Sequence, residues 1–381
     1  MRTSPSTGTA AACTAAVLAL LASGTTALAA PSDPPPAQGN EGRGYRATEV
    51  IAHRGASGYR PEHTVGAYEL AIQQCADYIE PDLVMTADGV LVDRHENEIS
   101  GTTDVAERPE FADRYTTKVV DGVSYSGWFT EDFTLAELKT LRAVERLPGL
   151  RPDNTAYDGR WDVPTFEEVL ELAAASRTCD GDPVGVIPEI KHGTYFDSIG
   201  LSMEEPVVEA LAAHGYDSPR DPAVIQSFEV ANLQELDGLT DVRLAQLVNC
   251  SGAPYDQVEA GTGLTYADMV TREGLRDVGE YADQVGLCKD VMIPREADGT
   301  LGEPTSVIKD AHRAHLTVVG WTFRAENEFL PAEFRSSDDP AELGDMVGEV
   351  QVFLAAGMDQ LFTDHPDLGV EAVQTRPRGR G

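Results

Sequence analysis

The feature of this sequence that most constrains its fold is a long alternation of strand-like and helix-like segments. Eight runs of apolar and β-branched residues recur between residues 49 and 364, and a segment with helical periodicity follows each run but the last. Strands that alternate with helices in this way form a parallel sheet covered by helices. Eight such units predict a fold of the α/β class, a (β/α)8 TIM barrel built as one domain.

The expected elements follow from this alternation. The predicted strands are residues 49–53, 78–85 (extended by 90–95), 184–190, 223–228, 242–248, 290–294, 316–323 and 360–364. The predicted helices are residues 64–75, 165–177, 204–214, 230–237, 275–283, 304–314 and 344–356. A doubly wound sheet is the alternative, but the glycine-rich phosphate turn that it often carries after its first strand is missing.

The first 30 residues are typical of a secretory signal peptide. Arg2 is their only charge, an apolar run follows, and small residues provide a cleavage position near Ala29 and Ala30. Residues 31–46 are rich in proline and glycine, which predicts a flexible spacer. We therefore expect a secreted, extracytoplasmic protein.

The barrel is expected to occupy residues 47–372, followed by a disordered basic tail over residues 373–381. The chain carries a formal net charge of −35. A surface this acidic argues against nucleic-acid partners, which bind proteins through their phosphates, and against docking to anionic membranes. No stretch after the leader is long and apolar enough to span a bilayer, so we expect no stable membrane insertion.

Two insertions interrupt the alternation, and both are expected at the C-terminal face of the barrel. Residues 96–161 are rich in aromatic side chains and directly follow a candidate active-site strand. They are expected to form either a lid over the substrate or a loop that packs a small core of its own. Residues 325–343 are short and acidic.

Three carboxylates are expected to meet inside the barrel mouth. Side chains alternate along a strand, so Glu80 and Asp82 share one face of the second strand, and Glu189 and Lys191 share one face of the third. Carboxylates that converge in a desolvated pocket repel one another, and Lys191 and Arg54 compensate this only in part. A hard divalent cation would compensate more, because all-oxygen ligands select calcium or magnesium over zinc. Export favours calcium, with magnesium as the alternative.

Two histidines are expected at the same mouth. His53 ends the first strand, and His95 ends the extension of the second. Imidazoles titrate near neutral pH, so a pair of them suits general acid and base catalysis. A nucleophilic side chain is not expected, because the sequence has no G-x-S-x-G motif.

Five motifs, read in order, resemble the glycerophosphodiester phosphodiesterases, most closely their exported, calcium-dependent branch. The motifs are HRGASGYRPEHT (53–64), IEPDLVMTADGVLVDRHE (79–96), IPEIK (187–191), GWTF (320–323) and GMDQLFTDHPD (357–367). They extend over nearly all of the chain after the spacer. Two positions depart from the common pattern: Glu96 follows His95 where many members have Asp, and His63 stands where many have Asn.

The resemblance implies a (β/α)8 barrel with a family-specific insertion, here residues 96–161. It also implies a set of site residues: His53 and His95 as the acid–base pair, Glu80, Asp82 and Glu189 as metal ligands, Arg54 and Lys191 on phosphate oxygens, Glu62 as an orienting group, and Trp321 and Phe228 beside the glycerol moiety. For Trp321, packing in the core is an equal alternative.

The implied reaction is metal-dependent hydrolysis of a small glycerophosphodiester to glycerol 3-phosphate and an alcohol. The 2-hydroxyl of the substrate would attack phosphorus to form a cyclic phosphate, with the two histidines moving the protons. The alternatives are an exported hydrolase that trims glycerol-phosphate polymers such as teichoic acid, a phospholipase D-like enzyme, and a non-catalytic calcium-dependent binder of phosphate esters. The proton-transfer pair argues against the binder.

Four cysteines follow the leader, which in an exported protein predicts two disulfides among three pairings. Cys75 and Cys179 fall at the ends of helices that lead into neighbouring strands, whereas Cys250 follows a strand and Cys288 lies nearby in sequence. These positions favour the pairs Cys75–Cys179 and Cys250–Cys288.

Overall fold

The computed structural model describes residues 48–375. The expected signal peptide and spacer and the last six residues of the basic tail lie outside the described residues.

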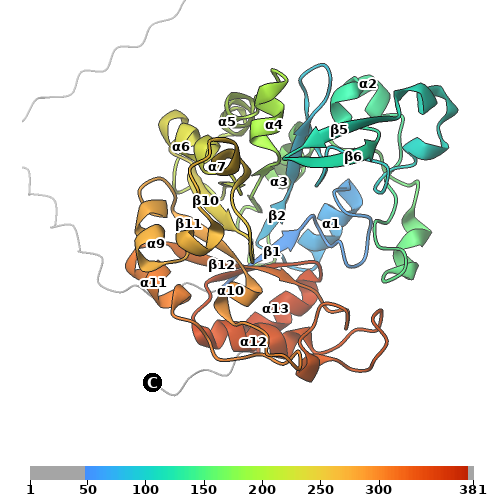
Figure 1. The fold of residues 1–381 in the computed structure, drawn as a ribbon. Coiled ribbons are helices and arrows are strands. Elements are labelled where there is room, and N and C mark those ends of the chain that lie inside the picture. Colours follow the sequence, from blue (N-terminus) through green and yellow to red (C-terminus); the bar gives the residue numbers. More distant parts are fainter. Residues whose placement is uncertain (1–47, 376–381) are drawn as a thin grey trace, which may run out of the picture. The chain divides into compact units, whose positions relative to one another are not determined.

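Eight parallel strands close into a barrel at the centre of the structure (Figure 1). In order they are β1 (Glu49–His53), the interrupted strand β2 (Tyr78–Glu80) and β3 (Asp82–Met85), the interrupted strand β7 (Gly185–Val186) and β8 (Glu189–Ile190), β9 (Val224–Ser227), β10 (Arg243–Val248), β11 (Gln284–Cys288), β12 (Thr317–Phe323) and β13 (Gln360–Thr363). The barrel closes because β1 pairs with β13 and β2, β2 pairs with β7, and β3 pairs with β8. The predicted barrel is confirmed, and the doubly wound sheet is wrong, because such a sheet has two free edges.

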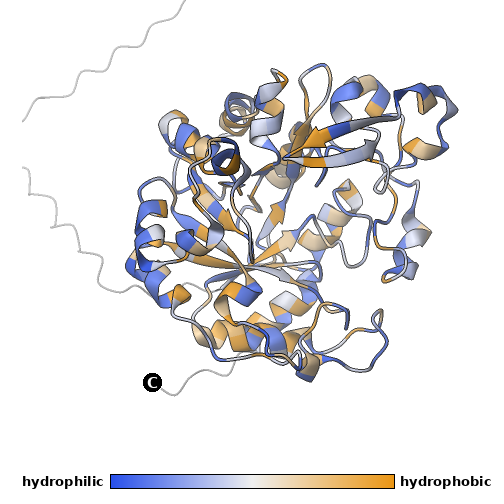
Figure 2. Ribbon diagram, in the orientation of Figure 1, coloured by the Kyte–Doolittle hydropathy of each residue, from blue (hydrophilic) through white to orange (hydrophobic). Residues whose placement is uncertain are grey.

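Helices surround the barrel, and the hydrophobic residues concentrate on the strands and on the helix faces that contact them (Figure 2). The principal helices are α1 (Val65–Gln73), α3 (Phe166–Ala175), α5 (Glu204–Ala213), α6 (Val230–Leu239), α9 (Arg272–Val278), α11 (Val307–Arg313), α12 (Met346–Ala356) and α13 (Pro366–Gln374). Shorter ones are α4 (Gly193–Ser198), α7 (Tyr255–Glu259), α8 (Tyr266–Met269) and α10 (Lys289–Met292). Local sequence fixes where several helices begin. At α3, the Thr165 hydroxyl accepts from the Glu168 backbone N–H, and the Glu168 carboxylate accepts from the Thr165 backbone N–H.

The sixth barrel strand is not where the sequence pattern predicted it. The strand expected at residues 290–294 is wrong, because β11 occupies residues 284–288 and residues 289–292 form the short helix α10. Every residue of β11 is buried, and the strand pairs with both β10 and β12, so tertiary pairing decided between two adjacent apolar runs. The last strand is also followed by a helix, α13, which the sequence reading omitted.

Residues 90–95 do not extend the second strand. They contain β4 (Leu91–Asp93), which turns back and pairs with β3 in the antiparallel direction. The backbone N–H of Arg94 donates to the Asp82 carbonyl at 2.9 Å. This return brings His95 next to Asp82 by a route that the sequence pattern did not predict.

The barrel interior is filled by a separate apolar cluster, made of Ile51, Tyr78, Ile187, Val224, Ala245, Val319 and Phe362, with Trp321 packed at its edge. Tyr78 and Ile187 face the interior, as expected from the same alternation that directs Glu80 and Glu189 inward. Because Cβ directions alternate, an inward Ile51 implies an inward His53. The apolar layer thus supports a polar layer directly above it, at the C-terminal mouth.

The insertion lies between β4 and α3. It contains β5 (Thr116–Val120), β6 (Val123–Gly127), α2 (Leu135–Leu138) and the 3-10 helices Val105–Glu107, Pro109–Arg114, Thr130–Asp132 and Pro152–Tyr157. Phe111 and Phe133 pack edge to face with ring centroids 5.0 Å apart, and both belong to the main hydrophobic core. The insertion is therefore anchored on the barrel by shared apolar packing.

Two disulfides join Cys75 to Cys179 and Cys250 to Cys288, the pairs favoured by the sequence positions. The first closes a loop with a sequence separation of 104, the second one of 38. No helix within residues 48–375 is long and apolar enough to cross a membrane.

Removing the first disulfide should cost more stability than removing the second. A longer closed loop constrains the unfolded chain more, so the double substitution C75S/C179S is expected to lower the free energy of unfolding by about 2–5 kcal/mol. The matched variant C250S/C288S should lose less. Urea unfolding of both variants and the parent protein checks this, and an equal loss in the two variants would contradict the loop-length argument.

Candidate active site

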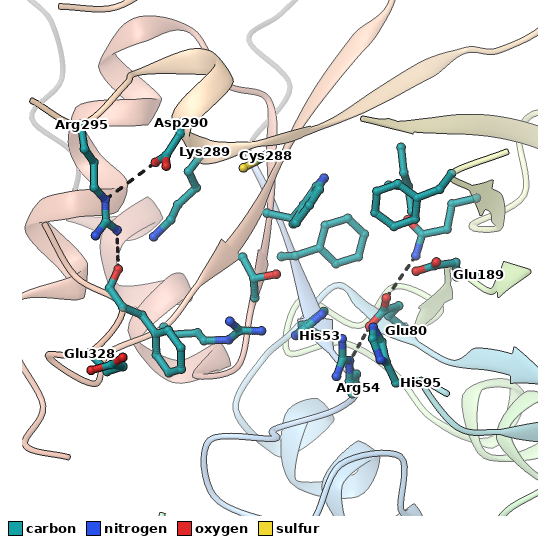
Figure 3. Close-up of a pocket in the computed structure, with 18 residues that line it drawn as sticks. His53, Arg54, Glu80, His95, Glu189, Cys288, Lys289, Asp290, Arg295 and Glu328 are labelled. Carbon is teal, nitrogen blue, oxygen red and sulfur yellow. Dashed lines mark hydrogen bonds and ion pairs between the residues drawn. The ribbon is translucent and has the colours of Figure 1, made fainter. Parts of the chain in front are cut away.

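A cavity of about 330 Å³ opens at the C-terminal mouth of the barrel (Figure 3). Its lining includes predicted site residues: His53, Arg54, Glu80, His95, Glu189, Phe228 and Trp321. The lining also includes charged and aromatic residues that the sequence did not predict: Lys289, Asp290, Arg295, Arg324, Glu328 and Phe329. This second group comes from α10 and from the loops that follow α10 and β12.

Three buried carboxylates converge beside the cavity. Glu80, Asp82 and Glu189 each offer an oxygen, and these oxygens lie within 4.8 Å of one another. Pro81 separates the first two residues and, having no N–H, interrupts the strand between β2 and β3. The Asp82 Oδ1 atom is buried and has no hydrogen-bond partner among residues 48–375. Such a set of converging, incompletely paired oxygens fits a hard divalent cation.

The protonation behaviour of these carboxylates reflects their crowding. Burial, together with the neighbouring Asp82 charge, raises the pKa of Glu80 well above its usual range. Burial also raises the pKa of Glu189 to about 8, although Lys191 opposes this. Asp82 is buried too, but His63, Lys191 and Arg54 hold its pKa well below the usual range. The cluster therefore concentrates more negative charge than its cationic neighbours neutralise.

Arg54 binds the carboxylates from the loop that follows β1. Its backbone N–H donates to Glu80 Oε2 at 2.7 Å, its Nη1 donates to Glu62 Oε2 at 3.2 Å, and its Nε lies 3.3 Å from Asp82 Oδ2. Arg54 has φ 61°, and Gly55 after it has φ 80°. A Cβ on Gly55 would approach the Ala67 backbone to 2.6 Å, so this tight turn requires glycine.

Two further predicted residues lie behind the cavity wall. Lys191 is buried, and its Nζ lies 3.0 Å from Glu189 Oε1. Glu62 is buried and accepts from Arg54 and from Arg146 of the insertion, the latter at 2.7 Å. Neither residue is part of the cavity lining.

His53 is held by a carboxylate that the sequence reading missed. Its Nδ1 lies 2.5 Å from Oδ1 of Asp364, which directly follows β13. The other oxygen of Asp364 accepts from Arg151 at 2.5 Å and from Arg324 at 2.8 Å. Asp364 is buried, but these guanidinium groups hold its pKa well below the usual range. The sequence contained a signal for Asp364, since this residue ends the predicted last strand and lies two residues after the inward-facing Phe362.

The pKa of His53 falls to about 4, because burial and the charge of Arg54 outweigh the attraction of Asp364. His53 is therefore neutral at pH 7. Its Nδ1–H donates to the Asp364 carboxylate, which leaves Nε2 as an acceptor for a proton. This arrangement resembles a general base oriented by a buried carboxylate.

His95 is held by a different set of groups. Its Nδ1 lies 2.8 Å from Oε1 of Glu96, whose Oε2 lies 3.0 Å from Nε2 of His192. Burial, with the charges of Arg54 and Lys191, lowers the pKa of His95 to about 3. Glu96 is thus in contact with the ring that it follows in sequence.

His63 lies outside the cavity and supports Asp82. Its Nε2 is 2.9 Å from Asp82 Oδ2, and its Nδ1 is 2.8 Å from the Tyr68 hydroxyl, which also donates to Asp93. The His63 side chain is fully buried. This residue orients a carboxylate of the cluster and does not face the cavity.

Trp321 and Phe228 form an apolar wall of the cavity. Their rings meet edge to face with centroids 5.6 Å apart, and the Trp321 indole N–H donates to the Gly286 carbonyl at 3.0 Å. Trp321 packs on the interior cluster and is also partly exposed toward the cavity. It therefore belongs to both the core and the cavity wall.

Comparison with known proteins identifies the family of the chain. A family profile described as the glycerophosphoryl diester phosphodiesterase family matches residues 53–368. The chain is 34% identical to glycerophosphodiester phosphodiesterase GDPD6 of Arabidopsis thaliana, over 82% of each protein. It is 28% identical to the glycerophosphodiester phosphodiesterase of Haemophilus influenzae, over 85% of this chain and 89% of that one.

Solved structures share the fold. A putative glycerophosphoryl diester phosphodiesterase from Silicibacter pomeroyi superposes with a TM-score of 0.60 at 20% identity, over 86% of this chain and 93% of that one. A phosphodiesterase from Oleispira antarctica, solved in complex with the product sn-glycerol-3-phosphate, superposes with a TM-score of 0.57 at 19% identity, over 86% and 97%. Together with the profile and the curated relatives, these matches cover the barrel and the cavity residues. The chain therefore belongs to the glycerophosphoryl diester phosphodiesterase family.

Proposed function

We propose that this glycerophosphodiester phosphodiesterase binds a divalent cation, calcium in the first place, and uses His53 and His95 to move protons during cleavage. The observation that carries the proposal is the convergence of Glu80, Asp82 and Glu189 within 4.8 Å, beside two histidines that line the same cavity. The exported, calcium-dependent branch of the family is the proposed relationship.

The donor set fits the cation. Glu80, Asp82 and Glu189 supply only oxygens, which suit calcium or magnesium and do not suit zinc. The unpartnered Oδ1 of Asp82 offers a free lone pair in a buried position. When bound, the cation would act as a Lewis acid that neutralises charge on the phosphate oxygens.

Other residues of the site would bind the phosphate and the glycerol moiety. Arg54 lines the cavity with a guanidinium that is anchored on Glu62, so it can hold a phosphate oxygen without reorganising. Lys191 adds a second positive charge next to the carboxylates. Trp321 and Phe228 give the glycerol carbons an apolar surface.

The first chemical step is an intramolecular attack. The 2-hydroxyl oxygen of the glycerol moiety bonds to phosphorus as one histidine removes its proton, and the P–O bond to the alcohol breaks as the other histidine protonates that oxygen. Intramolecular attack supplies about 7–11 kcal/mol when the groups are well oriented. Water then opens the five-membered cyclic phosphate with the histidine roles reversed, which yields glycerol 3-phosphate.

The proposed organisation of the whole chain follows from the same reading. Residues 1–30 are a signal peptide, residues 31–46 a spacer, residues 47–372 the barrel with its insertion at 96–161, and residues 373–381 a basic tail. Two disulfides favour an oxidising compartment, which supports an extracytoplasmic location. Such compartments contain ample calcium.

The substrate test uses two diesters. Purified protein should release glycerol 3-phosphate from glycerophosphocholine, and it should not cleave the analogue that lacks the 2-hydroxyl, because that analogue has no internal nucleophile. The analogue should still inhibit competitively, with an inhibition constant near the KM of the substrate. Cleavage of both diesters at similar rates would reject the cyclic intermediate, and no cleavage of glycerophosphocholine by folded protein would reject this substrate.

A further inference from the structure

The tip of the insertion approaches the site through a two-residue hairpin turn. Val120 pairs with Val123, so only Asp121 and Gly122 connect β5 to β6. Both have positive φ, 48° and 75°. An Asp-Gly pair with positive φ at both positions is typical of a type I′ turn. The short turn fixes the backbone of Asp121, and the hairpin reaches toward the start of α4 (Figure 1).

Three short contacts connect this turn to His95. Oδ2 of Asp121 lies 2.6 Å from Nδ1 of His192, and Nε2 of His192 lies 3.0 Å from Oε2 of Glu96. The other oxygen of Glu96 lies 2.8 Å from Nδ1 of His95. His192 precedes α4 with φ 53°, a left-handed conformation that fixes where its ring projects.

The charges of the side chains in this series of contacts define which atoms carry the protons. His192 stands between two carboxylates, so both of its ring nitrogens donate and the ring is a cation. Burial opposes this charge, but the hydrogen bonds to Asp121 and Glu96 raise the pKa of His192 to about 9. Glu96 then accepts from two imidazoles, one on each oxygen. His95 donates through Nδ1, which leaves its Nε2 as the acceptor.

We propose that Asp121 and His192 are positioning residues that, through Glu96, hold the His95 ring with Nε2 available to the substrate. This inference rests on the proposed role of His95 in proton transfer. It adds that the insertion sets the geometry of a catalytic residue in the barrel. Asp121, His192 and Glu96 are absent from the cavity lining, so they act on His95 and not on the substrate.

The test is a set of substitutions assayed for kcat and KM separately. Asp121→Asn keeps a residue that tolerates positive φ but removes the charge. It should lower kcat about tenfold, as expected for loss of one charge-assisted hydrogen bond, with KM unchanged. His192→Asn, which also tolerates its backbone conformation, should give a similar loss. Asp113→Asn, an exposed change in the same insertion, should leave kcat, KM and Tm at the parent values.

A double substitution tests whether the effect passes through Glu96. In a Glu96→Ala background, Asp121→Asn should cause no further loss of kcat, because the connection to His95 is already broken. A further tenfold loss in that background would overturn the proposal. An unchanged kcat for both Asp121→Asn and His192→Asn would also overturn it.

The failure of this inference is distinguishable from failure of the proposed function. If His95→Ala retains the parent kcat, then His95 does not transfer a proton and both ideas are wrong. If His95→Ala is inactive while Asp121→Asn and His192→Asn are fully active, the proposed function stands and the positioning role is wrong. Circular dichroism at the assay temperature establishes that each variant is folded.

Discussion

Replacing His53 by alanine should lower kcat by about 10²- to 10⁴-fold, the usual contribution of a positioned general acid or base. His53 lines the cavity, is neutral at pH 7 because its pKa falls to about 4, and presents Nε2 once Asp364 has accepted from Nδ1. The measurement is glycerol 3-phosphate release at saturating glycerophosphocholine.

Two further variants test the role of His53: one changes its hydrogen-bond partner, and the other is a control. Asp364→Asn should also lower kcat strongly, because an amide can donate to Nδ1 and favour the wrong tautomer of His53. It also leaves Arg151 and Arg324 with one anion fewer, so its stability should be measured in parallel. His312→Ala removes an exposed imidazole that pairs with Asp359 and does not line the cavity, so it should leave kcat unchanged. A fully active His53→Ala would remove this residue from the proton transfers.

The sequence pattern predicted the parts of the site that depend on one strand at a time. Glu80 and Asp82, or Ile187 and Glu189, project inward because the period of a strand is two, and this rule needs no knowledge of distant residues. The barrel itself followed from the count of β/α units. The sixth strand was misplaced because two apolar runs are adjacent in the sequence. Only the pairing of β11 with β10 and β12 distinguishes the strand from the run that follows it.

Contacts between distant segments could not be derived in that way. Asp364 and His53 are 311 residues apart, and Arg151 contacts Asp364 from the insertion, where the β/α alternation of the sequence is interrupted. The antiparallel return of β4 depends on a turn at residues 86–89, which the expected straight extension of the second strand did not contain. Local patterns therefore located the reacting groups, whereas the groups that orient them required the fold.

Removing divalent cations should abolish activity, and calcium should restore it. Burial raises the pKa values of Glu80 and Glu189, so these carboxylates bind protons that a cation would displace. Metal binding should therefore release protons and stabilise the folded protein. At a free calcium concentration 100 times Kd, the expected stabilisation is about 2.7 kcal/mol. Thermal unfolding with and without calcium measures it independently of catalysis.

Two variants distinguish calcium binding at this cluster from a general effect of calcium on the acidic surface. Asp82→Asn removes a central ligand and should lose both the calcium-dependent rise in Tm and the activity, whereas the exposed change Glu273→Gln should keep both. Magnesium in place of calcium tests which cation the cluster prefers, because magnesium demands six ligands in a smaller octahedron. If metal-free protein, verified by elemental analysis, hydrolyses glycerophosphocholine at the full rate, catalysis does not require a cation at this cluster. Arg54 and Lys191 would then have to neutralise the phosphate charge alone.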